Sequence, residues 1–561
     1  MSKFRALIVY PNLPMMLVPG IAVGLFTRIF RLQGYDVDLF DTTHYDSVET
    51  NYSDTSLNFA KNRVKLLSVR DYSIRKDLGI KVRDANMLAD FRTKVEEFQP
   101  DFMIFSVVED TWHQALSMLD AVQDLDIPHL MGGVFPTMAP KVCIDAPQVR
   151  LVGPGEGEDT VVAVAEAVRK GESLDGIDGT WFKTEDGEIR KYPARPLVDI
   201  NRIRPDFSLF ENNRFMRPIG GRIFKQIPVE TYRGCPYACT YCNSPAQRAF
   251  ADENDLGSFM RRKSISVLRD ELKACIEEHT PDDKNSPGIF FHFVDDSFLA
   301  RPRQEIFDFC DMYEEFKVPF VFNNRAEQNE TDTLMRLKEV GCYRVVLGLE
   351  AGNEQYRQII LRRKITNKEL IRRFRILADV GLPFSLNVIM GHPAETRELV
   401  MDSVELVRAI QGYDAVTCFT FTPYHGTTQR KVAEANGWLD PDTITHHYNS
   451  RSLLNMPPPY LSPDEIEGMM MTFPLYCYFP KDEWPNIRRA EKNDEKGQEI
   501  RKHYANIYQE NFFGETQESE KVYIPGPTSH WGKDPETYFQ ATPDRLEEDM
   551  IARLTLTGPT F

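Results

Sequence analysis

Three cysteines, Cys235, Cys239 and Cys242, stand within eight positions of a 561-residue chain that has nine cysteines in all. They follow the alternating apolar run KQIPVETY, which predicts a β-strand, so they should lie in the loop at its carboxyl end. Thiolates bind zinc, hold iron–sulfur clusters or form redox dithiols, and the close spacing indicates that these three act together.

Each of these chemistries makes a different demand on the sequence. A redox dithiol needs only Cys239 and Cys242 and leaves Cys235 unused. A zinc site needs a fourth ligand, and the nearest candidate on a predicted strand is His292, 50 residues past Cys242. An iron–sulfur loop uses all three thiolates for three irons of a [4Fe–4S] cluster and leaves the fourth iron open. The spacing favours the cluster over the zinc site, the dithiol and a chance grouping.

Further polar residues follow short apolar runs downstream of the cysteines. Helical patterns separate these runs, and the alternation is typical of a partial parallel (β/α)6 barrel whose active site lies at the carboxyl ends of its strands. The residues at or just past the predicted strand ends include Asp295, Asp296, Arg325, Gly348, Glu350, Gly391, Pro393 and Gly426.

The spacing CxxxCxxC, with Tyr241 just before the third cysteine, closely resembles the radical SAM superfamily. In that family S-adenosylmethionine (SAM) chelates the open iron through its amino and carboxylate groups. The resemblance therefore implies that Cys235, Cys239 and Cys242 bind a [4Fe–4S] cluster and that Tyr241 lies near the adenine of SAM.

Other stretches resemble the same family. DDSF matches the family's motif for the SAM amino group, GLE its motif for the ribose or amino group, and GHPAET its motif near the adenine. PYHGT matches its last motif, except that His425 replaces a proline. We expect His425 to face solvent, and the two RRK runs at 261–263 and 362–364 to be mainly solvated, although one arginine could neutralise the SAM carboxylate. The resemblance implies these cofactor-binding residues: Tyr241, Asp295, Asp296, Arg325, Gly348, Glu350, Gly391 and Pro393.

The amino-terminal part alternates short apolar runs with helical patterns, which predicts a doubly wound, Rossmann-like α/β sheet. Ligands of such sheets bind at the carboxyl ends of the strands. Ser106, Gly132, Gly133, Thr137 and the GPGEGE run at 153–158 lie there. No GxGxxG follows the first strand, which disfavours a dinucleotide site, and the glycines could simply form turns.

MGGVFPTMAP and GPGEGE resemble the cobalamin-binding domain that precedes the catalytic domain in one class of radical SAM enzymes. The resemblance implies that Ser106, Gly132, Gly133 and Thr137 contact the corrin and its nucleotide tail. The loop after the first strand has no histidine to bind cobalt from below, and His113 is only a remote candidate.

These patterns predict a cobalamin-binding domain at 1–185, a linker at 186–225, a radical SAM domain at 226–428 and a mostly helical region at 429–561 that caps the substrate side. The net charge of −17 disfavours nucleic acid or an anionic membrane as a partner. The apolar amino terminus is interrupted by prolines and fits neither a secretory signal nor a spanning helix, so we expect a cytoplasmic protein. The remaining six cysteines are expected to be buried.

The resemblance implies a cobalamin-dependent methyltransferase that methylates an unactivated carbon by means of a 5′-deoxyadenosyl radical and methylcobalamin. No catalytic residue is predicted, because hydrogen abstraction by a radical needs no general base from the protein. The expected electron donor is a flavodoxin or ferredoxin. The substrate stays open among natural-product, lipid, tetrapyrrole and peptide molecules. An oxidative cyclase or rearrangement enzyme of the same class, and a zinc-stabilised binding protein, are the alternatives.

Overall fold

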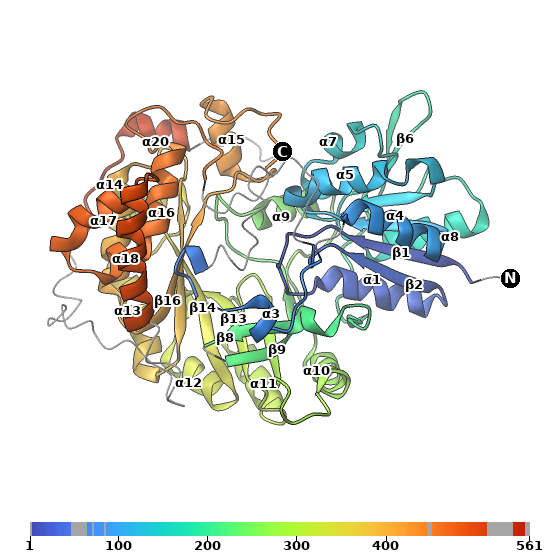
Figure 1. Ribbon diagram of the computed structural model, residues 1–561. Coiled ribbons are helices and arrows are strands. Elements are labelled where there is room, and N and C mark those ends of the chain that lie inside the picture. The colour runs from blue at the N-terminus through green and yellow to red at the C-terminus, as the bar shows by residue number, and fades with distance from the viewer. Residues whose placement is uncertain are drawn as a thin grey trace.

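The computed structural model describes residues 3–45, 64–69, 72–83, 86–220, 222–445, 451–512 and 542–555. These residues form two large sheets with helices around them (Figure 1). The first sheet has the order β2-β1-β3-β4-β5-β6-β7 and the second has the order β16-β15-β14-β13-β12-β9-β8. Parts of the predicted first domain and of the predicted carboxy-terminal region lie outside the described residues.

The first sheet is parallel from β2 to β5 and ends in an antiparallel hairpin. The order of its parallel strands reverses between β1 and β3, which is where doubly wound sheets bind ligands. Its strands are β1 (Arg5–Tyr10), β2 (Asp36–Asp41), β3 (Phe102–Ser106), β4 (His129–Gly132), β5 (Leu151–Gly153), β6 (Trp181–Lys183) and β7 (Ile189–Lys191).

Helices cover both faces of this sheet. Ala6 and Ile8 of β1 belong to the core on the side of α1 and α8, whereas Leu7 and Val9 belong to the core on the side of α4 and α5. All four side chains are fully buried, which explains why the strand reads as a continuous apolar run. The helices are α1 (Ile21–Leu32), α4 (Met87–Phe98), α5 (Trp112–Asp120), α6 (Val134–Met138), α7 (Pro140–Asp145) and α8 (Glu158–Lys170).

The second sheet confirms the predicted partial barrel. Six parallel strands follow one another, and the short strand β8 (Met216–Ile219) pairs antiparallel with β9 at the edge. The parallel strands are β9 (Arg222–Val229), β12 (Ile289–Phe293), β13 (Phe320–Arg325), β14 (Cys342–Glu350), β15 (Phe384–Met390) and β16 (Tyr413–Thr420). The helices between them are α10 (Ile265–His279), α11 (Arg303–Tyr313), α12 (Thr331–Glu339), α13 (Asn367–Val380) and α14 (Arg397–Ala409).

The carboxy-terminal region is helical where it is described. Helix α16 (Pro463–Tyr478) packs against β16 and α14, and α17 (Trp484–Ala490) and α18 (Glu495–Phe512) pack against α16 (Figure 1). Helices α15 (Thr428–Ala435) and α20 (Glu548–Leu554) contact each other. Gln509 of α18 donates a hydrogen bond to the carbonyl of Val69 over 3.4 Å, so this region reaches the segment between β2 and α4.

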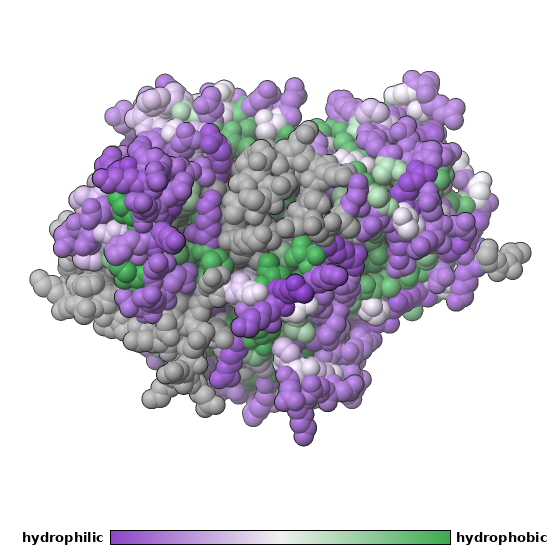
Figure 2. Space-filling view, in the orientation of Figure 1, coloured by the Kyte–Doolittle hydropathy of each residue, from purple (hydrophilic) through white to green (hydrophobic). Residues whose placement is uncertain are grey.

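The described residues contain no helix that is long and apolar enough to cross a membrane. Hydrophilic residues cover most of the face seen in Figure 2, with smaller groups of hydrophobic residues near its middle. The six cysteines outside the cluster are buried and form no disulfide, as predicted.

Candidate active site at the cysteine loop

The three clustered cysteines lie between the short strand β10 (Tyr232–Arg233) and helix α9 (Ser244–Glu253), past the carboxyl end of β9. None forms a disulfide; Cys239 is buried and the other two are partly buried. Burial raises the pKa of Cys235 to about 11 and that of Cys242 to about 12. They are therefore thiols near neutral pH unless a metal centre displaces their protons.

Asp295, at the end of β12, fixes the start of this loop. Its carboxylate accepts hydrogen bonds from the backbone N–H of Thr231 (2.7 Å) and Tyr232 (3.0 Å) and from Arg301 (2.6 Å). Gly234 is also required, because its φ is +102° and a Cβ there would lie 2.5 Å from a backbone oxygen of residue 259. The carboxylate of Asp295 thus already accepts its hydrogen bonds from groups of the protein.

Asp296, by contrast, is exposed and accepts one hydrogen bond, from the Ser244 hydroxyl over 3.2 Å. The surrounding protein limits its hydration, and this effect, with the nearby charge of Asp295, raises the pKa of Asp296. Of the two predicted aspartates, Asp296 is the one whose carboxylate can still reach a ligand.

Arg325, at the end of β13, connects the cysteine loop to a buried network of charges. Its guanidinium donates to Sγ of Cys239 over 3.3 Å and stacks on the Tyr237 ring at 3.7 Å. Arg325 and the fully buried Arg363 both pair with Glu327. Burial favours the neutral form of Glu327, but the two guanidinium groups outweigh burial and lower its pKa to about 2.

Glu350 lies at the other end of this network, where Arg363 donates to it over 3.1 Å. Its φ of +68° and a register shift in β14 turn the side chain back over Gly348. A Cβ at Gly348 would lie 2.0 Å from the Glu350 carboxylate, which explains the glycine in GLE. Burial raises the pKa of Glu350, and the charge of Glu350 adds to burial in raising the pKa of Tyr241.

The GHPAET loop after β15 lies beside the cysteine loop. The ring of His392 is 6.1 Å from that of Tyr241, and the carbonyl of Pro393 accepts a hydrogen bond from Tyr356 over 2.8 Å. The backbone N–H of Gly391 donates to the Glu395 carboxylate over 2.5 Å. The fold therefore brings the two predicted adenine-side elements together.

The four residues predicted to contact cobalamin at the first sheet fall into two groups: some leave room for a ligand, and the others hold the backbone of a loop. Ser106 and Gly132 are neighbours in register, and a Cβ on Gly132 would have no other atom within 3.8 Å. Gly133, with φ of +118°, is required because a Cβ would lie 2.3 Å from the carbonyl of Val107. Thr137 donates to the Gly133 carbonyl over 2.8 Å and accepts from Gly155 N–H over 3.0 Å.

Sequence reasoning missed the charges that connect the two sheets. Arg233, two residues before Cys235, pairs with Glu156, Glu158 and Glu230 at 2.9 Å each. Arg261 pairs with Glu156 at 2.6 Å. Glu156 and Glu158 belong to the GPGEGE run, so this run docks the first domain onto the cysteine loop. The position of Arg233 next to the first cysteine was the only sequence signal for this contact.

Some surface expectations were wrong. His425 does not face solvent: its ring and backbone N–H bond to Glu109 of the first domain at 2.8 and 2.9 Å. The RRK run at 261–263 is not mainly solvated, because Arg261 is largely buried against Glu156 and Lys263 pairs with a buried glutamate at 2.6 Å. In the run at 362–364, Arg362 and Lys364 are exposed as expected, whereas Arg363 is fully buried. Arg261, Lys263 and Arg363 can lie inside the molecule because each has a carboxylate partner.

No three or more His, Cys, Asp or Glu side chains among the described residues are close enough to hold a single metal ion. His292, the candidate fourth zinc ligand, lies on β12 with neither ring nitrogen hydrogen-bonded. The donor set of the loop, three free thiols beside a buried arginine, suits a cluster that carries its own sulfide.

Residues 229–407 match the model of the Radical SAM superfamily. This segment of the chain is a radical SAM domain. The matched segment of this radical SAM protein contains the cysteine loop, Asp295, Asp296, the Arg325–Glu327–Arg363–Glu350 network and the GHPAET loop.

Known proteins resemble this radical SAM protein over most of its length. An uncharacterized methyltransferase from Pyrococcus horikoshii is 25% identical over 380 residues, 65% of this chain and 77% of that protein. An anaerobic magnesium-protoporphyrin IX monomethyl ester cyclase from Rubrivivax gelatinosus is 24% identical over 330 residues, 56% of each chain. The methyltransferase TsrM from Kitasatospora setae, solved with cobalamin and a [4Fe–4S] cluster, shares the fold with a TM-score of 0.56 at 15% identity and covers 91% of this chain and 100% of its own.

These comparisons confirm the resemblance to cobalamin-dependent radical SAM enzymes and the predicted α/β architecture. The fold of TsrM extends over both sheets, so the first sheet is part of the shared architecture.

Proposed function

We propose that this radical SAM protein is a cobalamin-dependent methyltransferase that places a methyl group on an unactivated carbon of a small molecule. The observation that carries the proposal is the docking of the first sheet on the cysteine loop through Arg233, Glu156 and Glu158. These ion pairs support the proposal because they join the sheet that would bind cobalamin to the loop that would hold the cluster.

Specific side chains would hold each cofactor. Cys235, Cys239 and Cys242 would ligate the [4Fe–4S] cluster. Ser106 and Gly132 would lie against the corrin, with Gly133 and Thr137 shaping the loop. The residues proposed to contact SAM are Tyr241, Asp296, Arg325, Gly348, Glu350, Gly391 and Pro393. Asp295 would act through the loop that it holds.

When bound, these cofactors supply the electron, the radical and the methyl group, so the protein contributes position and exclusion of water. Arg325 places its guanidinium next to Sγ of Cys239, where its positive charge would attract an anionic cluster. Glu350 and Arg363 form a buried pair whose carboxylate can accept hydrogen bonds from a ribose or an amine. A flavodoxin or ferredoxin would donate electrons, and the reduced thiols suit the cytoplasm.

Anaerobic reconstitution tests the proposal. The purified chain should take up about four irons and four sulfides and bind cobalamin. With a reductant that supplies the electron it should cleave SAM to 5′-deoxyadenosine, and with a methyl-accepting substrate it should also form S-adenosylhomocysteine. Cys239→Ala should lose iron uptake, whereas Cys275→Ala, which removes another buried thiol, should keep it. If the wild-type chain takes up zinc but no iron, sulfide or cobalamin, the proposal is wrong, and the alternative of a zinc-stabilised binding protein is supported instead.

The similarity to a cyclase favours a second candidate, an oxidative cyclase or rearrangement enzyme with the same cofactors. Such an enzyme would form 5′-deoxyadenosine with substrate but no S-adenosylhomocysteine. Product analysis by mass spectrometry therefore separates the two candidates.

A further inference from the structure

The concave face of the second sheet carries polar side chains that have no hydrogen-bond or ion-pair partner among the described residues. Alternate residues of each strand face opposite ways. Phe291 and Phe293 of β12 belong to the core shared with the surrounding helices, so Phe290 and His292 face the inside of the partial barrel. Gln226 is in register with Phe290 and faces the same way.

Arg217 of β8 belongs to this inner face. It is paired in register with Phe224, whose ring lies 4.8 Å from that of Phe290 and 5.6 Å from that of Tyr343. Burial lowers the pKa of the Arg217 guanidinium, which Tyr72 only partly offsets. Within the described part of the chain, Arg217 forms neither an ion pair nor a hydrogen bond. Other inward arginines are paired, as Arg363 is with Glu350.

His292 lies near this arginine. Neither of its buried ring nitrogens makes a hydrogen bond of normal length within the described part of the chain. Burial together with the charge of Arg217 lowers its pKa to about 4, although the Asn323 side chain acts in the opposite direction. His292 is therefore neutral near pH 7 and can donate or accept a hydrogen bond. The side-chain oxygen of Gln226 is also buried and unpartnered. Native interiors rarely leave such atoms unsatisfied, and a group of them indicates a missing ligand.

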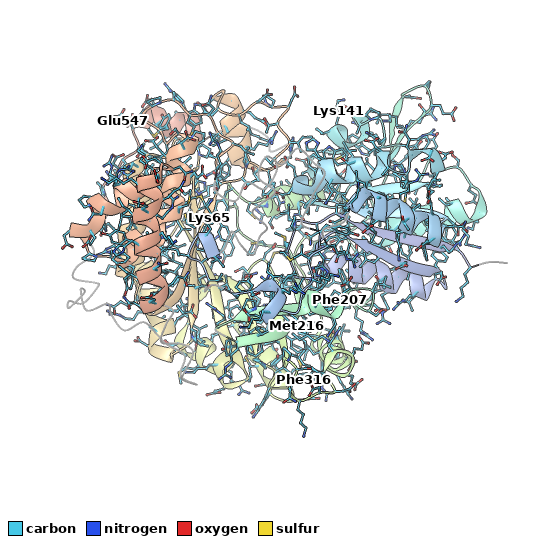
Figure 3. All side chains as sticks on the ribbon, in the orientation of Figure 1. Lys65, Lys141, Phe207, Met216, Phe316 and Glu547 are labelled. Atoms are coloured by element: carbon cyan, nitrogen blue, oxygen red, sulfur yellow. The ribbon has the colours of Figure 1, made fainter. Side chains whose placement is uncertain are left out.

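The position of this polar group fits a substrate rather than the cluster. Arg325, which touches Cys239, is two residues beyond Asn323 on β13, and the amide of Asn323 lies close to His292. Because His292 is in register with Val321, four residues before Arg325 on β13, it lies about 13 Å deeper in the barrel than Arg325. The segment 72–83, with α3 (Ile74–Asp77), packs against β8 and β9 through Met216 and Ile223, and Figure 3 shows Met216 beside α3.

We propose that Arg217 and His292 bind an anionic group of the substrate, a carboxylate or a phosphoryl group, inside the barrel below the SAM site. This inference rests on the proposed function, because the anionic group is taken to belong to the molecule that the enzyme methylates. Arg217 supplies the charge, His292 and Gln226 supply neutral hydrogen bonds, and the anion satisfies all three side chains at once.

Anion binding to the reconstituted holoenzyme tests this site, with inorganic phosphate and acetate as the probes. The chain is labelled with 13C-histidine, and the His292 signal is assigned by its loss in His292→Gln. A saturable change in the His292 chemical shift on addition of phosphate would indicate that the site binds a phosphoryl group. A saturable change on addition of acetate would indicate that it binds a carboxylate. Arg217→Gln should weaken binding at least tenfold. Arg222→Gln, at an exposed arginine of the same hairpin, should bind as the wild type does.

Two results would overturn the inference: a His292 signal that neither probe moves, or equal binding by the wild type and Arg217→Gln. If Arg217→Gln does not fold, Arg217→Lys takes its place; it keeps the charge but loses the planar guanidinium, and a weakened, still saturable response is expected. Iron content and SAM cleavage are measured in every sample. Loss of SAM cleavage in the wild type counts against the proposed function, whereas loss of anion binding with intact SAM cleavage counts against this site alone.

Discussion

Asp295 and Asp296 are adjacent in sequence, yet the structure gives them different tasks. Asp295 is buried, holds the backbone of the cysteine loop and pairs with Arg301, while Asp296 is exposed beside Ser244. A motif match assigned both to SAM, because a match cannot tell which of two neighbouring side chains turns inward.

Replacing each aspartate by asparagine should therefore impair a different property of the protein. Asp295→Asn leaves Arg301 without its buried partner, and we expect a loss of about 3–5 kcal/mol in the free energy of unfolding together with loss of iron. Asp296→Asn should keep stability and iron but weaken SAM binding about tenfold. Denaturant unfolding, iron analysis and equilibrium SAM binding check both variants. Equal stability of the two variants would contradict this assignment.

Gly348 makes a second residue-scale prediction. Gly348→Ala should push the Glu350 carboxylate away from Arg363, because the new methyl group would lie 2.0 Å from a carboxylate oxygen. We expect the dissociation constant for SAM to rise about tenfold while the iron content stays the same. Gly288→Ala is the matched control and should bind SAM normally, because a methyl group added at Gly288 would meet no atom within 4 Å.

At the scale of elements, the loop after β15 depends on a buried carboxylate that no cation neutralises. Burial raises the pKa of Glu395 from 4.5 to about 8, against the hydrogen bonds from the backbone N–H groups of Gly391 and His392. The folded protein therefore holds this proton more tightly than the unfolded chain. Its contribution to stability is complete below about pH 4.5 and is lost as the pH rises to about 8.

Within that window, Glu395 should lower the free energy of unfolding by about 1.4 kcal/mol for each pH unit. Glu395→Gln removes the titration and keeps an oxygen that can accept the same backbone hydrogen bonds, so its stability should fall less between pH 5 and 8. Urea unfolding at several pH values measures the difference. Glu510→Gln, at an exposed residue of α18, should follow the wild-type curve, and an unchanged slope in Glu395→Gln would refute the prediction.

At the scale of the molecule, two sets of contacts hold the sheets against each other: Arg233 and Arg261 on Glu156, and His425 and Tyr424 on Glu109 and Asp110. The chain between the sheets, residues 192–215, contains only one short 3-10 helix, at Asn212–Phe215. The relative position of the two proposed cofactor sites therefore depends on these side chains together with the hydrophobic core that both sheets share.

Glu156→Gln should loosen this docking, because it removes the charge that two buried arginines share. We expect cleavage by protease within 192–215 to become at least threefold faster and cobalamin to dissociate more readily. Glu188→Gln, in the exposed hairpin where Glu188 pairs with Arg190, should leave both unchanged. Limited proteolysis and cobalamin retention on gel filtration measure the two effects. Wild-type behaviour of Glu156→Gln would show that other contacts hold the domains.

The sequence by itself determined the cysteine loop, the strand ends and the two sheets, because spacing and periodicity are local properties of the chain. Only the tertiary structure decided how the charges pair. Arg233 meets Glu156 across 77 positions, His425 meets Glu109 across 316, and Arg325 meets Cys239 across 86. It also left Arg217 and His292 on the inner face without a hydrogen-bond or ion-pair partner among the described residues. Ion pairs between distant residues depend on how strands and loops converge, and no local pattern records that convergence.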